Sequence, residues 1–147
     1  MTEVRPARDV DEVRAALALR HEVFVVEQRV PLEEEIDAHD ETDALHLVAV
    51  EHEGRVVATA RVVMEGETAK LGRVAVARDA RRRGIASRLL AEGEARARGL
   101  GATRVALAAQ TDALPLYERA GYTAYGERFM DAGIEHQMME KRLAREP

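Results

Sequence analysis

The sequence predicts an α+β fold with a strand–helix–strand unit near its middle. Its 147 residues fit a single domain spanning residues 1–147, and a domain of this length buries roughly 68–70% of its unfolded surface. Two β-rich runs are joined by a hairpin signal. A third, Val-rich run is followed by a basic loop, a helical segment and another short strand, and these form the central unit.

The N-terminal third is expected to contain a short strand, one helix and an acidic loop. The strand is placed near Val4. Asp9 can cap the helix, with Glu12 three residues later as its partner in a capping box. Apolar residues then recur at near-helical spacing until Pro31 stops the pattern. The acidic stretch 33–43 is expected to form a loop or a short turn.

The remaining elements are expected in the order strand, strand, strand, helix, strand, helix, strand, strand. Their residue ranges are 45–51, 55–64, 69–77, 85–98, 105–109, 113–120, 122–125 and 135–142. The turn His52-Glu53-Gly54 joins the first two strands. Glycine follows each helix, as is typical of a helix C-terminus.

Composition excludes several classes of protein. The absence of Cys rules out disulfides, thiolate metal sites and any mechanism that places an acyl group on an enzyme thiol. The five His are too scattered to predict a metal site. No apolar stretch approaches the roughly 20 residues that span a bilayer, so we expect a cytoplasmic protein without a membrane partner.

The net charge of −5 is unevenly distributed along the chain. Residues 1–77 carry a balance of −8 and residues 105–147 a balance of −2, whereas residues 78–104 carry +5. A general nucleic-acid-binding protein needs a broad basic face, and this chain is acidic elsewhere. We therefore expect no nucleic-acid partner, and the local excess of Arg suits one compact polyanion.

The most informative segment, residues 73–86, leads from a strand through a basic loop into a helix. A helix N-terminus leaves about four backbone N–H groups unpaired and carries a partial positive charge, so it can bind an anion. Gly84 allows the backbone to approach a ligand, and Ala86 keeps the first turn narrow. The side chains of residues 81–83 add positive charge, although a solvated basic face explains them equally well at this point. The loop matches neither Gly-x-Gly-x-x-Gly nor Gly-Lys-Ser/Thr, which argues against dinucleotide and nucleoside-triphosphate enzymes.

Two motifs give the chain a resemblance to a known superfamily. The segment Arg81-x-x-Gly84-x-Ala86, after the strand Val74-x-Val76, resembles motif A of the GNAT superfamily of N-acetyltransferases. A second motif of that superfamily is matched about 30 residues later by Gln110-x-x-Ala113-x-x-Leu116-Tyr117-Glu118-Arg119-x-Gly121-Tyr122. The ends of the chain resemble the ElaA/YjcF-like branch, through Arg20-x-x-Val23-Phe24-Val25-Val26-Glu27-Gln28-x-Val30-Pro31, Glu34-Glu35-Ile36-Asp37, His46 and Asp131-Ala132-Gly133-Ile134-Glu135-His136.

This resemblance implies a fold and a cosubstrate. The fold would be a mixed, strongly bent sheet of six to seven strands flanked by about four helices, with central strands splayed apart for the cofactor. The cosubstrate would be acetyl-CoA, with loop amides around its pyrophosphate and the preceding strand along its pantetheine arm. The residues assigned to it are Val74, Ala75, Val76, Arg81, Arg82, Arg83, Gly84, Ile85, Ala86 and Gln110. Position 110 is more often Asn in the superfamily.

The implied reaction is direct attack of an amine on the acetyl thioester, without a covalent enzyme intermediate. Tyr117 lies where the superfamily often has a tyrosine that protonates the leaving thiolate, although packing in the core also explains it. The strand 105–109 offers no titratable group as a base. The candidates for that role are therefore Glu27, Glu34, His46, His136 or a water molecule. His46 alternates with two Leu residues, and this pattern favours a structural, hydrogen-bonded role.

Several alternatives remain open from the sequence. The acceptor is expected to be a small-molecule amine, with a protein or peptide amine as the nearest variant. The acidic stretch 33–43 would attract a cationic amine, or it is a solvated loop. A catalytically silent acyl-CoA-binding or sensor module is the rival function. A homodimer is compatible with the resemblance.

Overall fold

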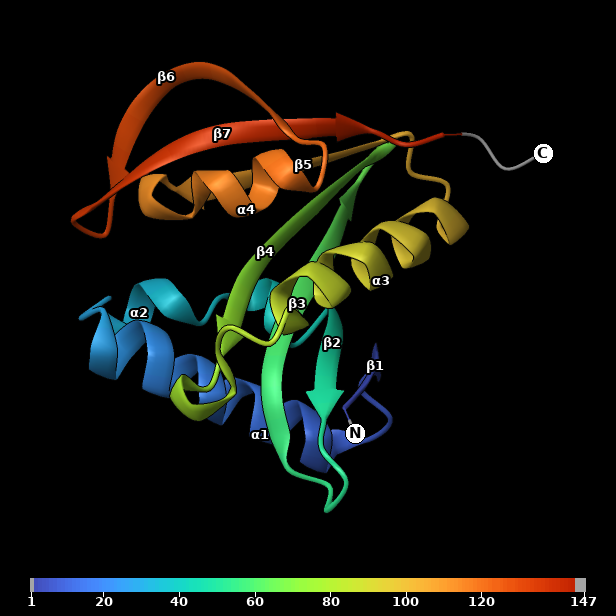
Figure 1. Ribbon diagram of the computed structural model, residues 1–147, viewed down its shortest axis with the longest axis vertical. Helices are drawn as coiled ribbons and strands as arrows, with labels where there is room; N and C mark the ends of the chain where they lie inside the picture. Colours follow the sequence, from blue (N-terminus) through green and yellow to red (C-terminus); the bar gives the residue numbers. More distant parts are fainter. Residues whose placement is uncertain (1, 145–147) are drawn as a thin grey trace.

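The computed structural model describes residues 2–144 and contains one mixed seven-stranded sheet in the order β1-β2-β3-β4-β5-β7-β6 (Figure 1). Only β4 and β5 pair in parallel; the other neighbours are antiparallel. The strands are β1 (Glu3–Pro6), β2 (Leu45–Val50), β3 (Val56–Glu65), β4 (Thr68–Val76), β5 (Arg104–Gln110), β6 (Thr123–Asp131) and β7 (Ile134–Arg142).

Four α-helices and several short helical segments connect the strands in the part of the chain that the structure describes. The α-helices are α1 (Val10–Arg20), α2 (Leu32–Glu35), α3 (Ile85–Gly99) and α4 (Leu114–Arg119). A π-helical segment, His21–Glu27, continues α1, and 3₁₀ segments cover Ala38–Asp40, Arg78–Ala80 and Thr111–Ala113.

The sheet has a helix on each face of its first four strands. Leu47 and Val48, consecutive in β2, are both fully buried because one faces the main apolar core under α3 and the other a smaller cluster with Ala16 of α1. The packing under α3 is close. A Cβ added to Gly93 would lie 2.6 Å from a methyl carbon of Leu71 in β4, so a larger residue there would force the Leu71 side chain to shift.

The sheet opens in the middle. β4 and β5 are paired only from Thr68–Lys70 to Arg104–Ala106, and beyond those three residue pairs they diverge. Figure 1 shows the result, with β5, β7, β6 and α4 turned away from β1 to β4. The register between β3 and β4 shifts just there, at a bulge that contains Arg73 with a φ of 53°. The expected fold, a bent mixed sheet of seven strands with about four helices and splayed central strands, is confirmed.

Local departures from the sequence predictions have physical reasons. Asp9 caps α1 by accepting from the amide of Glu12 (2.8 Å), but the carboxylate of Glu12 accepts from the amide of Arg8 (2.7 Å) instead of closing a capping box. The acidic stretch is not a solvated loop throughout. It contains α2 and a 3₁₀ turn, and the side chains of Glu35 and Asp40 are only 2% and 1% exposed.

Candidate active site

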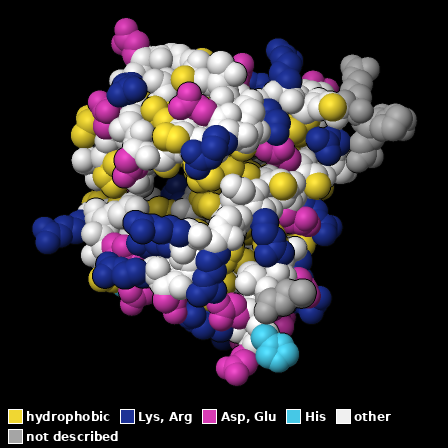
Figure 2. Space-filling view, in the orientation of Figure 1, with side chains coloured by type: hydrophobic (Ala, Val, Ile, Leu, Met, Phe, Trp, Pro, Cys, Tyr) yellow, Lys and Arg dark blue, Asp and Glu magenta, His cyan; other side chains and the backbone are white. Residues whose placement is uncertain are grey.

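A cavity of about 910 Å³ lies where β4 and β5 diverge. Its walls come from β4, β5, β7, the π-helical segment, α2, α4 and the start of α3. In the space-filling view a hollow separates the two halves of the molecule, and Lys and Arg side chains gather along its rim (Figure 2). Nine of the ten residues expected to hold the cosubstrate line the cavity, and the exception is Arg83.

The loop before α3 exposes backbone amides to this cavity. Arg82 and Gly84 have left-handed φ values of 65° and 75° on either side of Arg83, a pattern that turns successive N–H groups toward one point. No side chain caps α3, and its first turn contains no acidic residue, so the amides of Ile85, Ala86 and Ser87 keep the unpaired state of a helix N-terminus, and the first intrahelical bond comes from the amide of Arg88. A Cβ at Gly84 would meet no atom within 4 Å, which shows that the space before these amides is open.

The three loop arginines differ in their contacts. Arg81 donates from Nε to the carbonyl of Val76 (3.0 Å) and pairs with Glu27 (2.9 Å). Arg83 pairs with Glu51 (3.2 Å) and donates to the carbonyl of Asp79 (2.9 Å). Within residues 2–144, Arg82 makes no hydrogen bond or ion pair through its side chain, and it lines the cavity. Arg82 is therefore the loop side chain that is available to an anion.

The strand before the loop presents its main chain to the cavity. Val74, Ala75 and Val76 all line it, on the edge of β4 that β5 has left. Ala75 is 1% exposed, whereas Val74 and Val76 on either side of it are half-buried.

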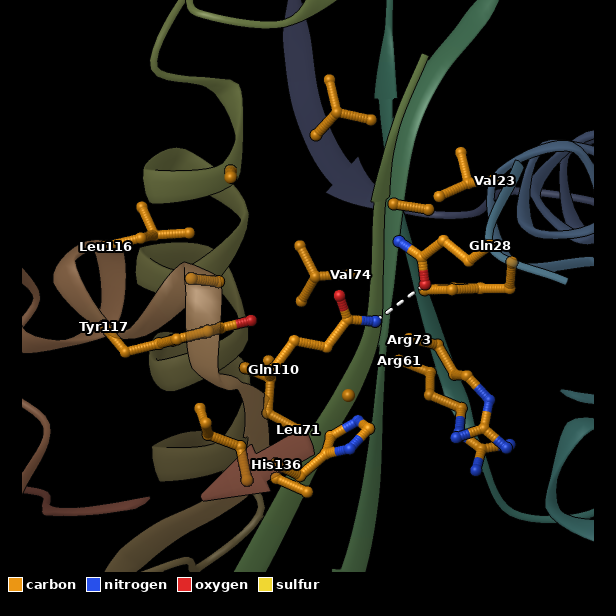
Figure 3. A pocket seen from close by; sticks show the side chains of 18 of the residues that line it. Val23, Gln28, Arg61, Leu71, Arg73, Val74, Gln110, Leu116, Tyr117 and His136 are labelled. Atoms are coloured by element: carbon orange, nitrogen blue, oxygen red, sulfur yellow. Dashed lines mark hydrogen bonds between the residues drawn. The ribbon is translucent and has the colours of Figure 1, made fainter. Parts of the chain in front are cut away.

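Gln110 and Tyr117 approach the cavity from β5 and α4. Gln110 donates from Nε2 to Oε1 of Gln28 (2.8 Å) and so joins β5 to the end of the π-helical segment. Tyr117 is 8% exposed and packs edge-to-face against Tyr122, with 6.1 Å between ring centroids. Figure 3 shows its hydroxyl directed toward Val74 and Gln110. Burial raises the pKa of Tyr117 to about 12, so the phenol stays protonated at neutral pH.

The four base candidates lie in different environments. Glu34 is exposed and lines the cavity. Glu27 also lines it, but hydrogen bonds from Arg81 and Arg78 lower its pKa, which makes it a weak base. His46 lies outside the cavity lining and bonds through Nε2 to the carbonyl of Asp40 (3.2 Å), in agreement with the structural role favoured by its alternation with Leu.

His136 has the geometry of a base. It lines the cavity on β7 and stacks on Phe129, with 5.7 Å between ring centroids. Its Nδ1 lies 2.7 Å from the carbonyl oxygen of Ile134. Because a carbonyl only accepts, Nδ1 carries the proton and Nε2 of the neutral ring keeps a lone pair.

A buried ion network at the α2 end of the cavity was missed by the sequence analysis. Arg20, 1% exposed, bonds to Glu35 (2.5 Å) and Asp40 (2.7 Å). Arg61 bonds to Asp37 (2.7 Å) and Asp40 (3.0 Å). Burial opposes the ionisation of Asp40, but hydrogen bonds from Arg20, the amide of Asp37 and Arg61 outweigh it, so the pKa of Asp40 is well below its usual range. The network holds α1 and α2 against β3.

Residues 2–144 contain neither a cluster of metal ligands nor a helix that could span a membrane. No group of three or more His, Asp or Glu side chains is arranged to hold a metal ion. None of the helices in that range has the length and apolarity to cross a bilayer.

The fold with an open strand edge leading into this loop is that of known acyltransferases, and the protein is of that class. An acyl-CoA N-acyltransferase from Pseudomonas aeruginosa has the same fold, with a TM-score of 0.83 and 30% identity over 96% of this chain and 98% of that one. The structure of Escherichia coli ElaA gives a TM-score of 0.83 at 27% identity over 99% of this chain and all of that one.

Sequence comparison specifies the family. The profile of the acetyltransferase (GNAT) domain matches residues 7–143, and this chain belongs to that family. It is 38% identical over 136 residues to the uncharacterized N-acetyltransferase YjcF of Bacillus subtilis, covering 92% of this chain and 96% of YjcF. Together with the ElaA structure, this relative confirms the predicted ElaA/YjcF-like branch.

Proposed function

We propose that this acyltransferase moves an acetyl group from acetyl-CoA to the amine of a small molecule, by direct attack. The proposal rests on one observation about the cavity. The edge of β4 that β5 leaves unpaired runs along the cavity and leads into the loop of residues 81–86, whose backbone amides are also unpaired. Such amides suit a diphosphate, and the strand edge suits the amide-containing pantetheine arm. Gln110 would contact that arm from the opposite wall.

The side chains in the cavity can serve the proton transfers of the reaction. Nε2 of His136 would take a proton from the attacking ammonium or amine, directly or through water. The amine nitrogen bonds to the carbonyl carbon, the C–S bond breaks, and the hydroxyl of Tyr117 would give its proton to the leaving thiolate. The backbone N–H groups of the 74–76 strand would stabilise the carbonyl oxygen as charge develops on it. No enzyme nucleophile is needed.

Several further parts of the proposal are independent of the chemistry. We propose one domain, 1–147, a cytoplasmic location, no nucleic-acid partner, and a homodimer as a compatible assembly.

A catalytically silent acyl-CoA-binding module would share the loop and the strand edge. The cavity placement of Tyr117 and His136 supports an enzyme over that module, and a protein or peptide amine is the second acceptor class.

The donor site is tested by a matched pair of glycine variants. Gly84 and Gly54 have left-handed φ values of 75° and 85°, and at both positions an added Cβ would meet nothing. Gly84→Ala and Gly54→Ala therefore carry a similar backbone strain of about 1–2 kcal/mol. By calorimetry, Gly84→Ala should weaken CoA binding about 10-fold or more, as expected when one or two charge-assisted hydrogen bonds are lost. Gly54→Ala should leave the affinity for CoA unchanged. Equal affinities of the two variants for CoA would refute the loop site.

The chemical step is tested by removing the proposed acid. Tyr117→Phe should lower kcat for thiol release about 10²- to 10⁴-fold while the KM for acetyl-CoA changes little. His136→Gln should lower kcat, because the glutamine side chain cannot accept the proton. If Tyr117→Phe retains full turnover of every accepted amine, the phenol only packs against Tyr122.

A further inference from the structure

The guanidinium of Arg73 lies at the α2 end of the cavity, beside Arg61 (Figure 3). Its Nε donates to the carbonyl of Glu35 (3.1 Å), and its Nη2 donates to the carbonyl of Glu34 (3.2 Å). Nη2 is also 3.5 Å from a carboxylate oxygen of Asp37. Nη1 has no hydrogen-bond partner within residues 2–144. The side chain is thus held by two neutral carbonyls and a longer contact with Asp37, with Nη1 free within that range.

The acids around Arg73 are already engaged with other arginines. Glu35 is paired with Arg20, and Asp37 makes two 2.7 Å bonds to Arg61. Burial, and then repulsion by Arg61 and Arg20, lower the pKa of Arg73. Burial disfavours a charge of either sign, but the repulsion from Arg61 and Arg20 would become an attraction for an anion, opposed by the charges of Asp37 and Glu35.

The backbone conformation at Arg73 orients its side chain, and the cavity is open next to it. Arg73 belongs to the β4 bulge and has a φ of 53°, a conformation that costs a non-glycine residue free energy. The bulge places its side chain on the same segment of α2 and the following turn that Arg61 contacts. Next to it, a Cβ at Gly72 would meet nothing within 4 Å, so the cavity is open at this point. Arg73 directly precedes Val74, where the proposed acyl site begins.

We propose that the acceptor of this enzyme carries an anionic group, a carboxylate or a phosphate, which binds to Nη1 of Arg73 while its amine reaches the acyl group beside Val74. The inference rests on the proposed function and specifies its substrate class. Arg61 reinforces the positive potential, but its own donors are largely used by Asp37 and Asp40. One free guanidinium nitrogen suits a single carboxylate, as in an amino acid.

The first test compares matched acceptors by thiol release from acetyl-CoA. Amino acids are set against their amides, and phosphoethanolamine against ethanolamine, so that the two sources of the anion are separated. In the accepted pair the anionic member should have a kcat/KM about 10- to 100-fold higher, the range of a charge-assisted hydrogen bond. Equal use of both members in every pair would overturn the inference.

Variants at position 73 then assign the effect to Arg73. Arg73→Gln keeps the length and the strained backbone but removes the charge, so it should raise KM for the anionic acceptor about 10- to 100-fold and leave the neutral one and acetyl-CoA unchanged. Arg73→Lys should recover part of the loss. A drop that is equal for anionic and neutral acceptors would mean a structural role for Arg73.

A binding experiment separates this inference from the proposed function. Calorimetry measures the affinity of N-acetylated amino acids and of their amides in the presence of CoA. Preference for the acid in the wild type, lost in Arg73→Gln, supports the anion site even if no amine is acetylated, in which case only the proposed function fails. Turnover of neutral amines without preference for the acid in either assay leaves the proposed function standing and refutes the anion site.

Discussion

Two groups of arginines lie near the two ends of one cavity, and their contacts with the protein differ. Arg20 and Arg61, at the α2 end, are 1% and 8% exposed and bond to buried or half-buried carboxylates. The loop group, Arg81 to Arg83, lies at the surface, where its ion pairs involve exposed or half-exposed side chains. Arginine content alone therefore does not indicate a role in binding. The buried group holds α1 and α2 against β3, whereas for the loop we propose that mainly the backbone contacts the ligand.

The largest effect should come from Arg20. Arg20→Ala leaves Glu35 and Asp40 buried without this partner and should lower the free energy of unfolding by about 3–5 kcal/mol in urea titrations. Arg55→Ala removes an exposed pair with Asp79 and is the control, with no measurable change expected. If both variants lose the same stability, the distinction between buried and surface arginines is invalid.

A smaller effect should come from Arg61, and it should depend on pH. Arg61 lowers the pKa of Asp37 and Asp40 below their ordinary value of 3.8, so their contribution to stability is complete above that pH and is lost as the pH falls toward the folded-state values. Arg61→Gln should cost about 1–3 kcal/mol at neutral pH and move the acid-unfolding midpoint upward. The midpoint is measured by circular dichroism. An unchanged midpoint would contradict the assigned pairing.

The loop arginines should affect binding instead of stability. Arg82→Ala should weaken CoA binding up to about 5-fold, with the difference shrinking at high salt, because an exposed charge contributes about 0.2–1 kcal/mol and is screened. Its unfolding free energy should stay within about 0.5 kcal/mol of the wild type. A large stability loss would place Arg82 with the buried group.

The smallest effect is expected at the neighbouring position. Arg83 lies outside the cavity lining and pairs with Glu51, so Arg83→Ala should change CoA affinity by less than about 2-fold. Calorimetry of Arg82→Ala and Arg83→Ala side by side separates a charge at the site from the general charge of the loop. Equal losses would show that only the summed charge matters.

The order of the elements and the loop were predictable because their signals are local, whereas the bent sheet with splayed central strands was predicted only through the family resemblance. Gly84 and Ala86 lie within a few residues of the strand that they follow, and the residues facing the core of α3 recur at helical spacing. Tyr117 also lies in a contiguous motif, and its proposed role, like those of the loop residues, stays a prediction.

The buried ion network could not be predicted because its partners are 15 to 24 residues apart along the chain. A signal was present nonetheless. Arg61 interrupts the apolar pattern of β3, and a charge in the middle of a buried strand requires a partner. The acidic stretch 33–43 supplied the partners, but a run of charges is normally solvated, so sequence reasoning assigned it to the surface.

Two further features of the structure differ from the predicted elements because hydrophobic periodicity in the sequence does not reveal them. The π-helical segment contains a bond from the amide of Gln28 to the carbonyl of Val23 (3.1 Å), an i to i−5 spacing that the sequence pattern does not reveal. β6 is longer than the expected strand 122–125. All of its residues are exposed, so it has no buried face that would impose an alternation of apolar and polar residues on the sequence.

The short ladder between β4 and β5 has a consequence for how the protein responds to its donor. Only three residue pairs join the two halves of the sheet directly, and beyond them the bare edge of β4 offers main-chain groups to any amide-rich chain that lies alongside. The pantetheine arm proposed to bind there would take the place of a strand and bridge both halves of the sheet. The melting temperature should therefore rise with the logarithm of donor concentration, and amide exchange should slow first at Val74 and Val76.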